Sequence, residues 1–229
     1  PSTTRNAAYT PPDCVPPQLT QGAIRATPAL VMNARVGARQ SRSRSPFLFD
    51  PEVLGRVARG VLGQPLESMV EQIATQLEQE YPGHIRHDRP WVLNNAGGAM
   101  GMMTVLHASI TEYVIVFGSP IGTEGHTGRF WAEDYFFILE GEQWAYSENS
   151  PTREVYKPGD LHVLPKGLAQ GYRMPDRCFA LEYARGFIPA MLPFGLADTL
   201  FGTLDWQTLG KTLSLYGKST IKELMQGKI

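Results

Sequence analysis

The stretch MTVLHASITEYVIVFG at residues 103–118 decides the fold class, because β-branched and aromatic side chains dominate it. Three later stretches share this texture and are set apart by turn residues: RFWAEDYFFILEG at 129–141, REVYKPGDLHVLPKG at 153–167 and CFALEYARG at 178–186. Several strands of this kind around one core favour a sandwich or a barrel. We therefore expect residues 84–188 to form a small β-barrel with an apolar interior and one interior carboxylate, Glu182, suited to a hydrophobic ligand.

Apolar residues at helical spacing flank the expected barrel on both sides. Asp50-Pro51 is a helix-starting pair, and a second helical pattern begins at Pro65, so we expect a helical hairpin over 47–83. Two amphipathic helices are expected over 189–229. The last of them carries a stripe at steps of three and four residues: Trp206, Leu209, Leu213, Tyr216 and Thr220. Helices of this kind are typical of a membrane surface, and packing on the barrel is an equally open alternative.

Composition excludes several classes of protein. The chain has 21 Lys and Arg against 22 Asp and Glu in 229 residues, and a net charge of −1 predicts no nucleic-acid partner. Its two cysteines, Cys14 and Cys178, are too few for a disulfide framework and are expected to be free thiols. No apolar run approaches the roughly 18 residues that a membrane-spanning helix needs.

The first 46 residues differ from the rest of the chain. They contain seven prolines, six arginines and the run SRSRS, with Asp13 as the sole acid. Such a segment buries too little apolar surface to fold alone, so we expect an extended arm over 1–46 and a single domain over 47–229. An Arg-rich, acid-poor segment is also typical of organelle targeting, and a plain disordered arm is the alternative.

The stretch GDLHVLPKGLAQ at 159–170 resembles the second signature of cupin barrels. Where a metal-binding cupin has its next histidine ligand, this chain has Gln170, a poor ligand for zinc or iron. Of the first signature, Asp134 and Gly141 keep their spacing, but only His126 stands near the expected histidine pair. We therefore expect a mainly β, metal-free, cupin-like barrel without a cofactor, so that its chemistry would depend on carboxylates, histidine and aromatic faces.

Four blocks in order along the chain closely resemble the fungal C-8 sterol isomerases and their relative, the sigma non-opioid intracellular receptor. The blocks are NNAGGAMGMMTVLHASITEYVIVFG (94–118), PIGTEGHTGRFWAEDYF (120–136), LEYARGFIP (181–189) and LPFGLADTLFGTLDW (192–206). The resemblance spans roughly Phe49 to Met225. It implies membrane-lying C-terminal helices, a homotrimer and the endoplasmic reticulum. The Arg-rich arm leaves open the mitochondrial inner membrane, with the chain as a subunit of a larger membrane complex.

The resemblance also implies that Glu182 is the acid essential to catalysis in the isomerases, or to holding a cationic amine in the receptor. In the receptor an aspartate pairs with that glutamate, and its place here is taken by Phe136. Side chains alternate along a strand, so Asp134 shares the face of Phe136 and is the expected partner. Glu133 is the alternative partner. Asp134 could instead be a carboxylate at the rim of the barrel that hydrogen-bonds to a loop.

Two carboxyls that share one proton fit the shift of a sterol double bond from C8 to C7, which needs one proton added and another removed. His107, placed by alternation with Met103 and Val105, is expected to orient a carboxyl or the sterol hydroxyl, or to be a core histidine bonding backbone. The expected substrate-binding side chains are apolar or aromatic: Met103, Val105, Tyr113, Ile115, Phe117, Phe136, Leu192 and Tyr216. The alternative function is a non-catalytic, lipid-binding scaffold subunit, and an amine receptor is a third hypothesis.

Overall fold

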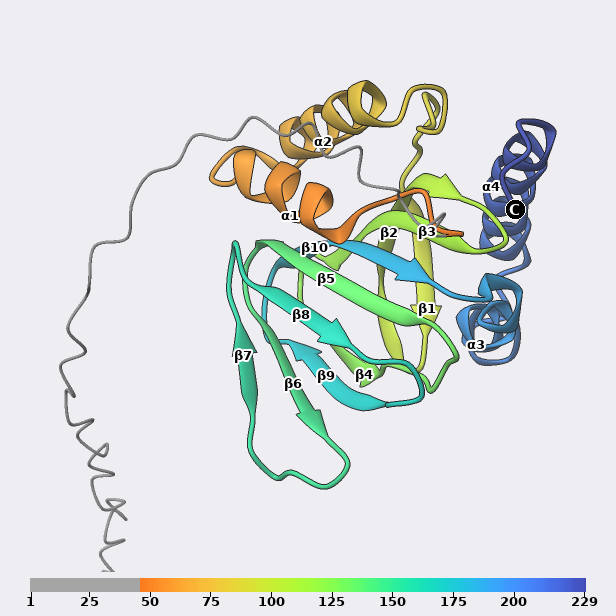
Figure 1. Ribbon diagram of the computed structural model, residues 1–229. Helices are drawn as coiled ribbons and strands as arrows, with labels where there is room; N and C mark the ends of the chain where they lie inside the picture. The colour runs from red at the N-terminus through yellow and green to blue at the C-terminus, as the bar shows by residue number, and fades with distance from the viewer. Residues whose placement is uncertain (1–45) are drawn as a thin grey trace, which may run out of the picture. The chain divides into compact units, whose positions relative to one another are not determined.

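A computed structural model describes residues 46–229, so the predicted arm lies outside the described residues except for Pro46. Two helices, α1 (Pro51–Gly60) and α2 (Leu66–Glu80), precede ten strands (Figure 1). The strands are β1 (Val92–Ala96), β2 (Ala99–Ala108), β3 (Glu112–Ser119), β4 (Thr123–His126), β5 (Glu133–Glu140), β6 (Gln143–Ser147), β7 (Glu154–Tyr156), β8 (Leu161–Leu164), β9 (Gln170–Met174) and β10 (Cys178–Arg185). The chain ends with the short helix η1 (Ile188–Ala190), α3 (Leu192–Ala197), the π-helical turn η2 (Asp198–Gly202) and α4 (Trp206–Met225).

Two antiparallel sheets form the body of the domain. The larger sheet has the strand order β1-β2-β3-β10-β5-β8, and the smaller has the order β4-β9-β6-β7. The chain crosses between them repeatedly, so that β5 belongs to one sheet and β6 to the other, and the sheets enclose a common interior (Figure 1). The predicted mainly β, barrel-like fold is confirmed.

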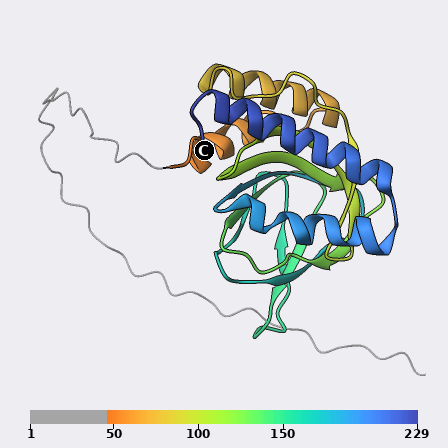
Figure 2. The ribbon, with the colours of Figure 1, turned by 90° about the vertical axis from the view of Figure 1, so that its right-hand side faces the viewer.

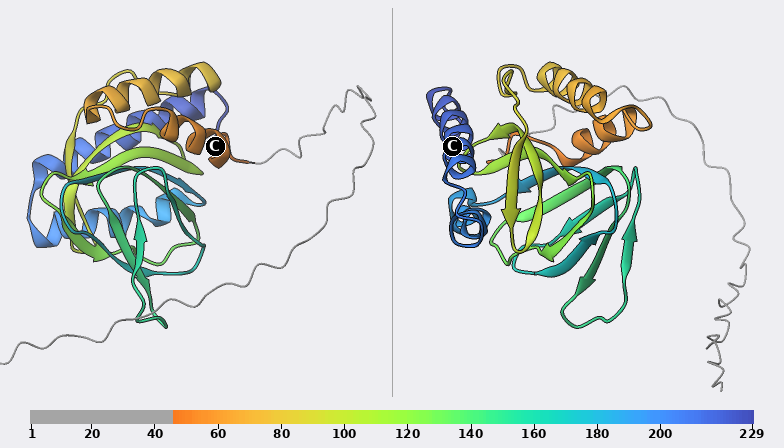
Figure 3. Two further views of the ribbon diagram at one scale, coloured as in Figure 1. Left: turned by 90° about the vertical axis from the view of Figure 1, so that its left-hand side faces the viewer. Right: turned by 180° about the vertical axis from the view of Figure 1, so that it is seen from behind.

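The six-stranded sheet is buried on both faces, which explains the continuous apolar run in β3, where all eight residues are buried. One face packs under α1 and α2, where Leu54, Ile73 and Leu77 have no exposed surface. A fully buried side chain of this size contributes about 1.5–3 kcal/mol. The opposite face lines the barrel interior with side chains such as Ile115 and Phe117. Figures 2 and 3 show the helix pair lying over the sheet.

A β-bulge interrupts the pairing of β2 with β3. Val105 lies opposite Ile115, but the next paired residue is His107, which lies opposite Val114. Paired residues share one face of a sheet, and Val114 belongs to the outer face under α1 and α2. The extra residue therefore turns His107 out of the barrel interior, as bulges do by shifting the alternation by one.

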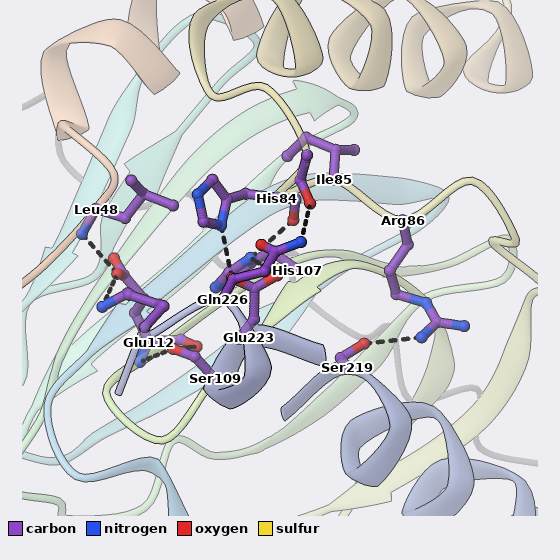
Figure 4. A network of polar contacts seen from close by, with 12 residues as sticks. Leu48, His84, Ile85, Arg86, His107, Ser109, Glu112, Ser219, Glu223 and Gln226 are labelled. Atoms are coloured by element: carbon purple, nitrogen blue, oxygen red, sulfur yellow. Dashed lines mark hydrogen bonds and ion pairs between the residues drawn. The ribbon is translucent and has the colours of Figure 1, made fainter. Parts of the chain in front are cut away.

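Helix α4 packs against β1 and β2 with a polar face (Figure 2). Its buried residues are Thr208, Thr212, Leu215, Ser219 and Glu223. Glu223, only 2% exposed, lies 2.6 Å from His84 Nδ1, and Arg86 donates to the Ser219 hydroxyl at 2.8 Å (Figure 4). Two residues of the predicted apolar stripe face away from the barrel instead, since Trp206 is 66% exposed and Leu213 is 47% exposed.

Glu112 is a second buried acid, and it contacts residues from both ends of the domain. Glu112 has no exposed surface and accepts a hydrogen bond from the backbone N–H of Leu48 at 2.6 Å (Figure 4). It also accepts one from the hydroxyl of Tyr183 at 2.9 Å. Lys228 Nζ lies 2.7 Å from its Oε1. The charge of Glu112 is therefore matched by a C-terminal lysine and by hydrogen-bond donors at the start of the domain, a pattern of full pairing that buried charges require.

Candidate active site

A cavity with an empty volume of about 890 Å³, which includes its open mouth, lies between the two sheets and reaches the C-terminal helices. Its strand-borne lining residues are Asn94, Ala96, Met103, Tyr113, Ile115, Phe117, His126, Asp134, Phe136, Gln143, Tyr172 and Glu182. The loop after β4 and the C-terminal segment add Thr127, Phe130, Ile188, Met191, Leu192, Phe194, Gly195, Leu196, Thr212 and Tyr216. No lysine or arginine of residues 46–229 lines this cavity, so its carboxyls have no cation beside them.

Two carboxyls share the inward face of neighbouring strands. On the β5–β10 ladder Asp134 lies opposite Ala184, and Glu182 lies opposite Phe136. Asp134 and Glu182 are thus diagonal neighbours on one face, a placement in which side chains on antiparallel strands interact. The register places Asp134 on the face that alternation along β5 predicted, and Asp134 is 4% exposed. Its role as the partner of Glu182 stays a prediction.

The surroundings favour one shared proton on this pair. Burial, and then the charge of Glu182, raise the pKa of Asp134 well above its usual range, and Asp134 Oδ1 has no hydrogen-bond partner in the structure. Burial also raises the pKa of Glu182, whereas the Tyr113 hydroxyl, which donates to Glu182 Oε1 at 2.5 Å, lowers it. The hydrogen bond from Tyr113 stabilises the carboxylate form of Glu182, and Asp134 Oδ1 accepts none, so these surroundings favour the protonated form more at Asp134 than at Glu182.

Glu133, the alternative partner, lies on the outer face of β5. Arg185 donates to its Oε2 from Nε at 2.8 Å and from Nη2 at 2.7 Å, and the Tyr135 hydroxyl donates to the same oxygen. The Arg185 guanidinium holds the pKa of Glu133 below its usual value. Glu133 is therefore an ionised partner of Arg185 and does not face Glu182.

Most of the predicted site residues line the cavity, but Val105 and His107 do not. Val105 belongs to the interior core on the same face and is covered by its neighbours. The expectation that His107 shares the face of Met103 is wrong, because the bulge intervenes. His107 packs its ring against Phe49 and donates from Nδ1 to the carbonyl of His84 at 2.9 Å, and burial lowers its pKa (Figure 4). Its surroundings are those of a core histidine that hydrogen-bonds to the backbone.

Sequence reasoning missed several lining residues from the smaller sheet and the C-terminal segment. Gln143 and Tyr172 come from β6 and β9, and Ile188, Met191 and Phe194 come from η1, the turn after it and α3. For Gln143 and Tyr172 no local motif exists, because their inward direction depends on which sheet the strand joins. Met191 and Phe194 lie within the helical spacing that follows Pro189, which could have indicated them, whereas Ile188 precedes it.

No cluster of three or more histidine, cysteine or acidic side chains that could hold a metal ion occurs within residues 46–229. Gln170, at the position of a cupin histidine ligand, contacts His162 Nε2 through its Oε1 at 2.7 Å and donates to Ser147 at 3.0 Å. Cys178 is buried and free, and Cys14 lies outside the described residues. The amide of Gln170 is therefore bonded to its neighbours, whereas His162 Nδ1 has no hydrogen-bond partner among the described residues.

The fold and the site define a class: mainly β domains that hold a buried carboxyl pair in an apolar cavity closed by C-terminal helices. The chain belongs to the family described as ERG2 and Sigma1 receptor like protein, whose family model matches residues 26–228. The C-8 sterol isomerase of Mycosarcoma maydis is 51% identical over 206 residues, covering 85% of this chain and 86% of the relative. That of Neurospora crassa is 48% identical, covering 82% and 76% of the two chains.

Receptors and cupins are also similar to this chain. Sigma non-opioid intracellular receptor 1 of Xenopus tropicalis is 42% identical over 179 residues, covering 77% of this chain and 81% of the receptor. Among solved structures, an RmlC-like cupin from Shewanella frigidimarina has a TM-score of 0.35 at 15% identity, covering 42% of this chain and 84% of that one. The predicted resemblance to the isomerase and receptor family is confirmed.

Proposed function

We propose that this chain is an isomerase that moves a sterol double bond from C8 to C7 with its own carboxyl pair as donor and acceptor. The observation that carries the proposal is the placement of Asp134 and Glu182 on one inward face of an apolar cavity that contains no lysine or arginine of the described residues. Several similar fungal proteins are named C-8 sterol isomerase. The reaction is internal to the substrate, so it requires no redox partner.

Each carboxyl has its own role in the two proton transfers. Asp134 gives its proton to C9 of the alkene, which forms a C9–H bond and leaves a tertiary cation at C8. Glu182, ionised and held by Tyr113, removes a proton from C7, and the electrons of that C–H bond form the C7–C8 double bond. The protein regains one proton for the one it gave, and a transfer between the two carboxyls restores the resting state.

Aromatic faces and the remaining carboxylate stabilise the cation. Tyr113 and Tyr216 meet edge to face with ring centres 6.2 Å apart, and Phe117 and Phe136 line the same cavity. The faces of such rings attract a positive charge, most strongly where water is excluded. An ammonium ligand resembles this cation, so an amine that fits the cavity is expected to inhibit competitively.

The exposed apolar side chains of the C-terminal segment support a membrane-surface location. Phe201 is 79% exposed, Leu204 63% and Met225 83%, and with Trp206 and Leu213 they lie on α4 or just before it. Because α4 turns polar residues toward the barrel, its apolar side chains are left for another apolar phase. No helix of residues 46–229 is long and apolar enough to cross a membrane.

Family resemblance extends the proposal to a homotrimer at the endoplasmic reticulum, where a sterol would reach the cavity from the bilayer past α3 and α4. The comparisons give no support to the mitochondrial location. Analytical ultracentrifugation of the full chain in detergent tests the trimer. A monomer at micromolar concentration would contradict that part of the proposal.

The direct test is turnover of a Δ8 sterol by the purified full chain in detergent made up in heavy water. The product is expected to be the Δ7 sterol with one deuterium at C9, identified by mass spectrometry and NMR. Complementation of a yeast strain that lacks its sterol isomerase is the matching test in cells. Binding of the sterol without conversion in either assay would favour the non-catalytic, lipid-binding alternative.

A further inference from the structure

One buried polar group in the cavity has no part in the proton transfers. Among the described residues, only two cavity-lining side chains contain a buried oxygen without a hydrogen-bond partner, Asp134 and Gln143. Gln143 is 1% exposed, and its Oε1 is the unpartnered atom. A buried acceptor without a partner costs free energy, so native structures keep few of them without a reason. The proton chemistry explains Asp134 but leaves Gln143 unexplained.

Gln143 lies at one end of the cavity, away from the carboxyl pair. It begins β6, three residues after the end of β5, whereas Glu182 lies opposite Phe136 within β5. Phe136 and Glu140 are four residues apart, which is about 13 Å along a strand. Asp134 lies further from Gln143 along β5, and β10 then leads into η1 and α3. In Figure 1, β6 and α3 lie on opposite sides of the barrel.

The side chains that the segment from η1 to α3 contributes to the cavity are apolar. They come from η1, α3 and the residue between them: Ile188, Met191, Leu192, Phe194 and Leu196. Along the cavity the order is therefore the amide oxygen of Gln143, the carboxyl pair and the apolar side chains of η1 and α3, with Asn94 and His126 among the other lining residues. A Δ8 sterol has the same order along its length, with a hydroxyl on ring A, the double bond at ring B and an alkyl tail on ring D.

We infer that Gln143 binds the 3-hydroxyl of the sterol, so that ring A enters first and the alkyl tail remains at α3. This inference rests on the proposed function and adds to it the orientation of the substrate and a residue that selects a hydroxylated ring. The hydroxyl donates to Gln143 Oε1, and the buried acceptor gains the partner it lacks. Gln143 is a positioning residue, because it holds the double bond level with Asp134 and Glu182 without touching the reacting carbons.

The test compares a saturated 3β-hydroxy sterol with its 3-deoxy counterpart, both radiolabelled, in equilibrium binding to the full chain in detergent. Wild type is expected to prefer the hydroxy sterol about tenfold, the size of one neutral hydrogen bond. Gln143→Met, which keeps the length of the side chain, is expected to abolish the preference and to leave the affinity for the deoxy ligand unchanged. That unchanged affinity also shows that the cavity of the variant is intact.

Two outcomes would overturn the inference: a preference that persists in the variant, or an equal loss of affinity for both ligands, which is a packing effect. Binding does not require turnover, so the outcome is separate from that of the proposed function. A wild-type chain that prefers the hydroxy sterol through Gln143 but does not isomerise it would refute the reaction and leave the orientation standing. With active enzyme, the variant is also expected to lower kcat/KM about tenfold for the hydroxylated substrate only.

Discussion

Replacing Asp134 with Asn separates proton donation from folding. The side chain is 4% exposed, and burial and then the charge of Glu182 raise its pKa well above its usual range, which favours the protonated, neutral form. Asparagine has the same shape and is also neutral, so the free energy of unfolding is expected to change by less than about 1 kcal/mol. It has no proton to give to the alkene, and loss of a positioned acid costs about 10²–10⁴ in rate.

The assay is kcat for a Δ8 sterol, with sterol binding measured in parallel. A fall of about 10²–10⁴ in kcat at nearly constant affinity is expected. The matched control is Glu133→Gln, one residue away but on the outer face and bonded to Arg185. It is expected to leave kcat unchanged and to cost at most about 1 kcal/mol of stability. Wild-type activity in Asp134→Asn, or a larger loss in the control, would refute the assignment of the donor.

Three further changes probe the base, the buried acid and the sheet. Tyr113→Phe removes the hydrogen bond that lowers the pKa of Glu182 against the effect of burial. Glu182 then protonates at higher pH, so the acidic limb of the pH–rate profile should move to higher pH. An unmoved limb would contradict the role of Glu182 as the base. Glu112→Gln breaks the buried pair with Lys228, which should cost about 3–5 kcal/mol in chemical denaturation; a loss below about 1 kcal/mol would show that the pair is dispensable. Gly118→Ala would place a methyl 2.2 Å from a carbonyl oxygen of β10, so the melting temperature should fall, whereas an unchanged value would mean that the strands can separate there.

Much of the fold was predictable because its signals are local. The β-branched texture of 103–118 marks strands that are buried on both faces, and Asp50 does cap α1 by accepting the N–H of Glu52 at 2.9 Å. The placement of Asp134 on the same face as Glu182 could be predicted because β5 alternates regularly from Glu133 to Phe137. Within one uninterrupted strand, sequence alone tells which side chains share a face.

Two features could not be predicted, because they depend on tertiary pairing. The bulge after Val105 adds one residue to β2 and sends His107 to the outer face, and nothing in TVLHAS announces it. In α4 the apolar stripe left open a membrane surface or packing on the barrel, and nothing in it indicated that Thr208 and Glu223 would be buried. Partners of these polar groups, such as His84 for Glu223, come from distant segments, so a polar face became the buried one.

Glu182→Gln probes whether the buried carboxyl pair isomerises a sterol. The variant retains the volume of the side chain and an oxygen that can accept from Tyr113, but it cannot take a proton from C7. The assay follows conversion of a Δ8 sterol to the Δ7 product with sterol binding as a control. If Glu182 is the base, sterol binding stays normal and kcat falls at least about 10²-fold. Conversion at the wild-type rate would contradict this role of Glu182.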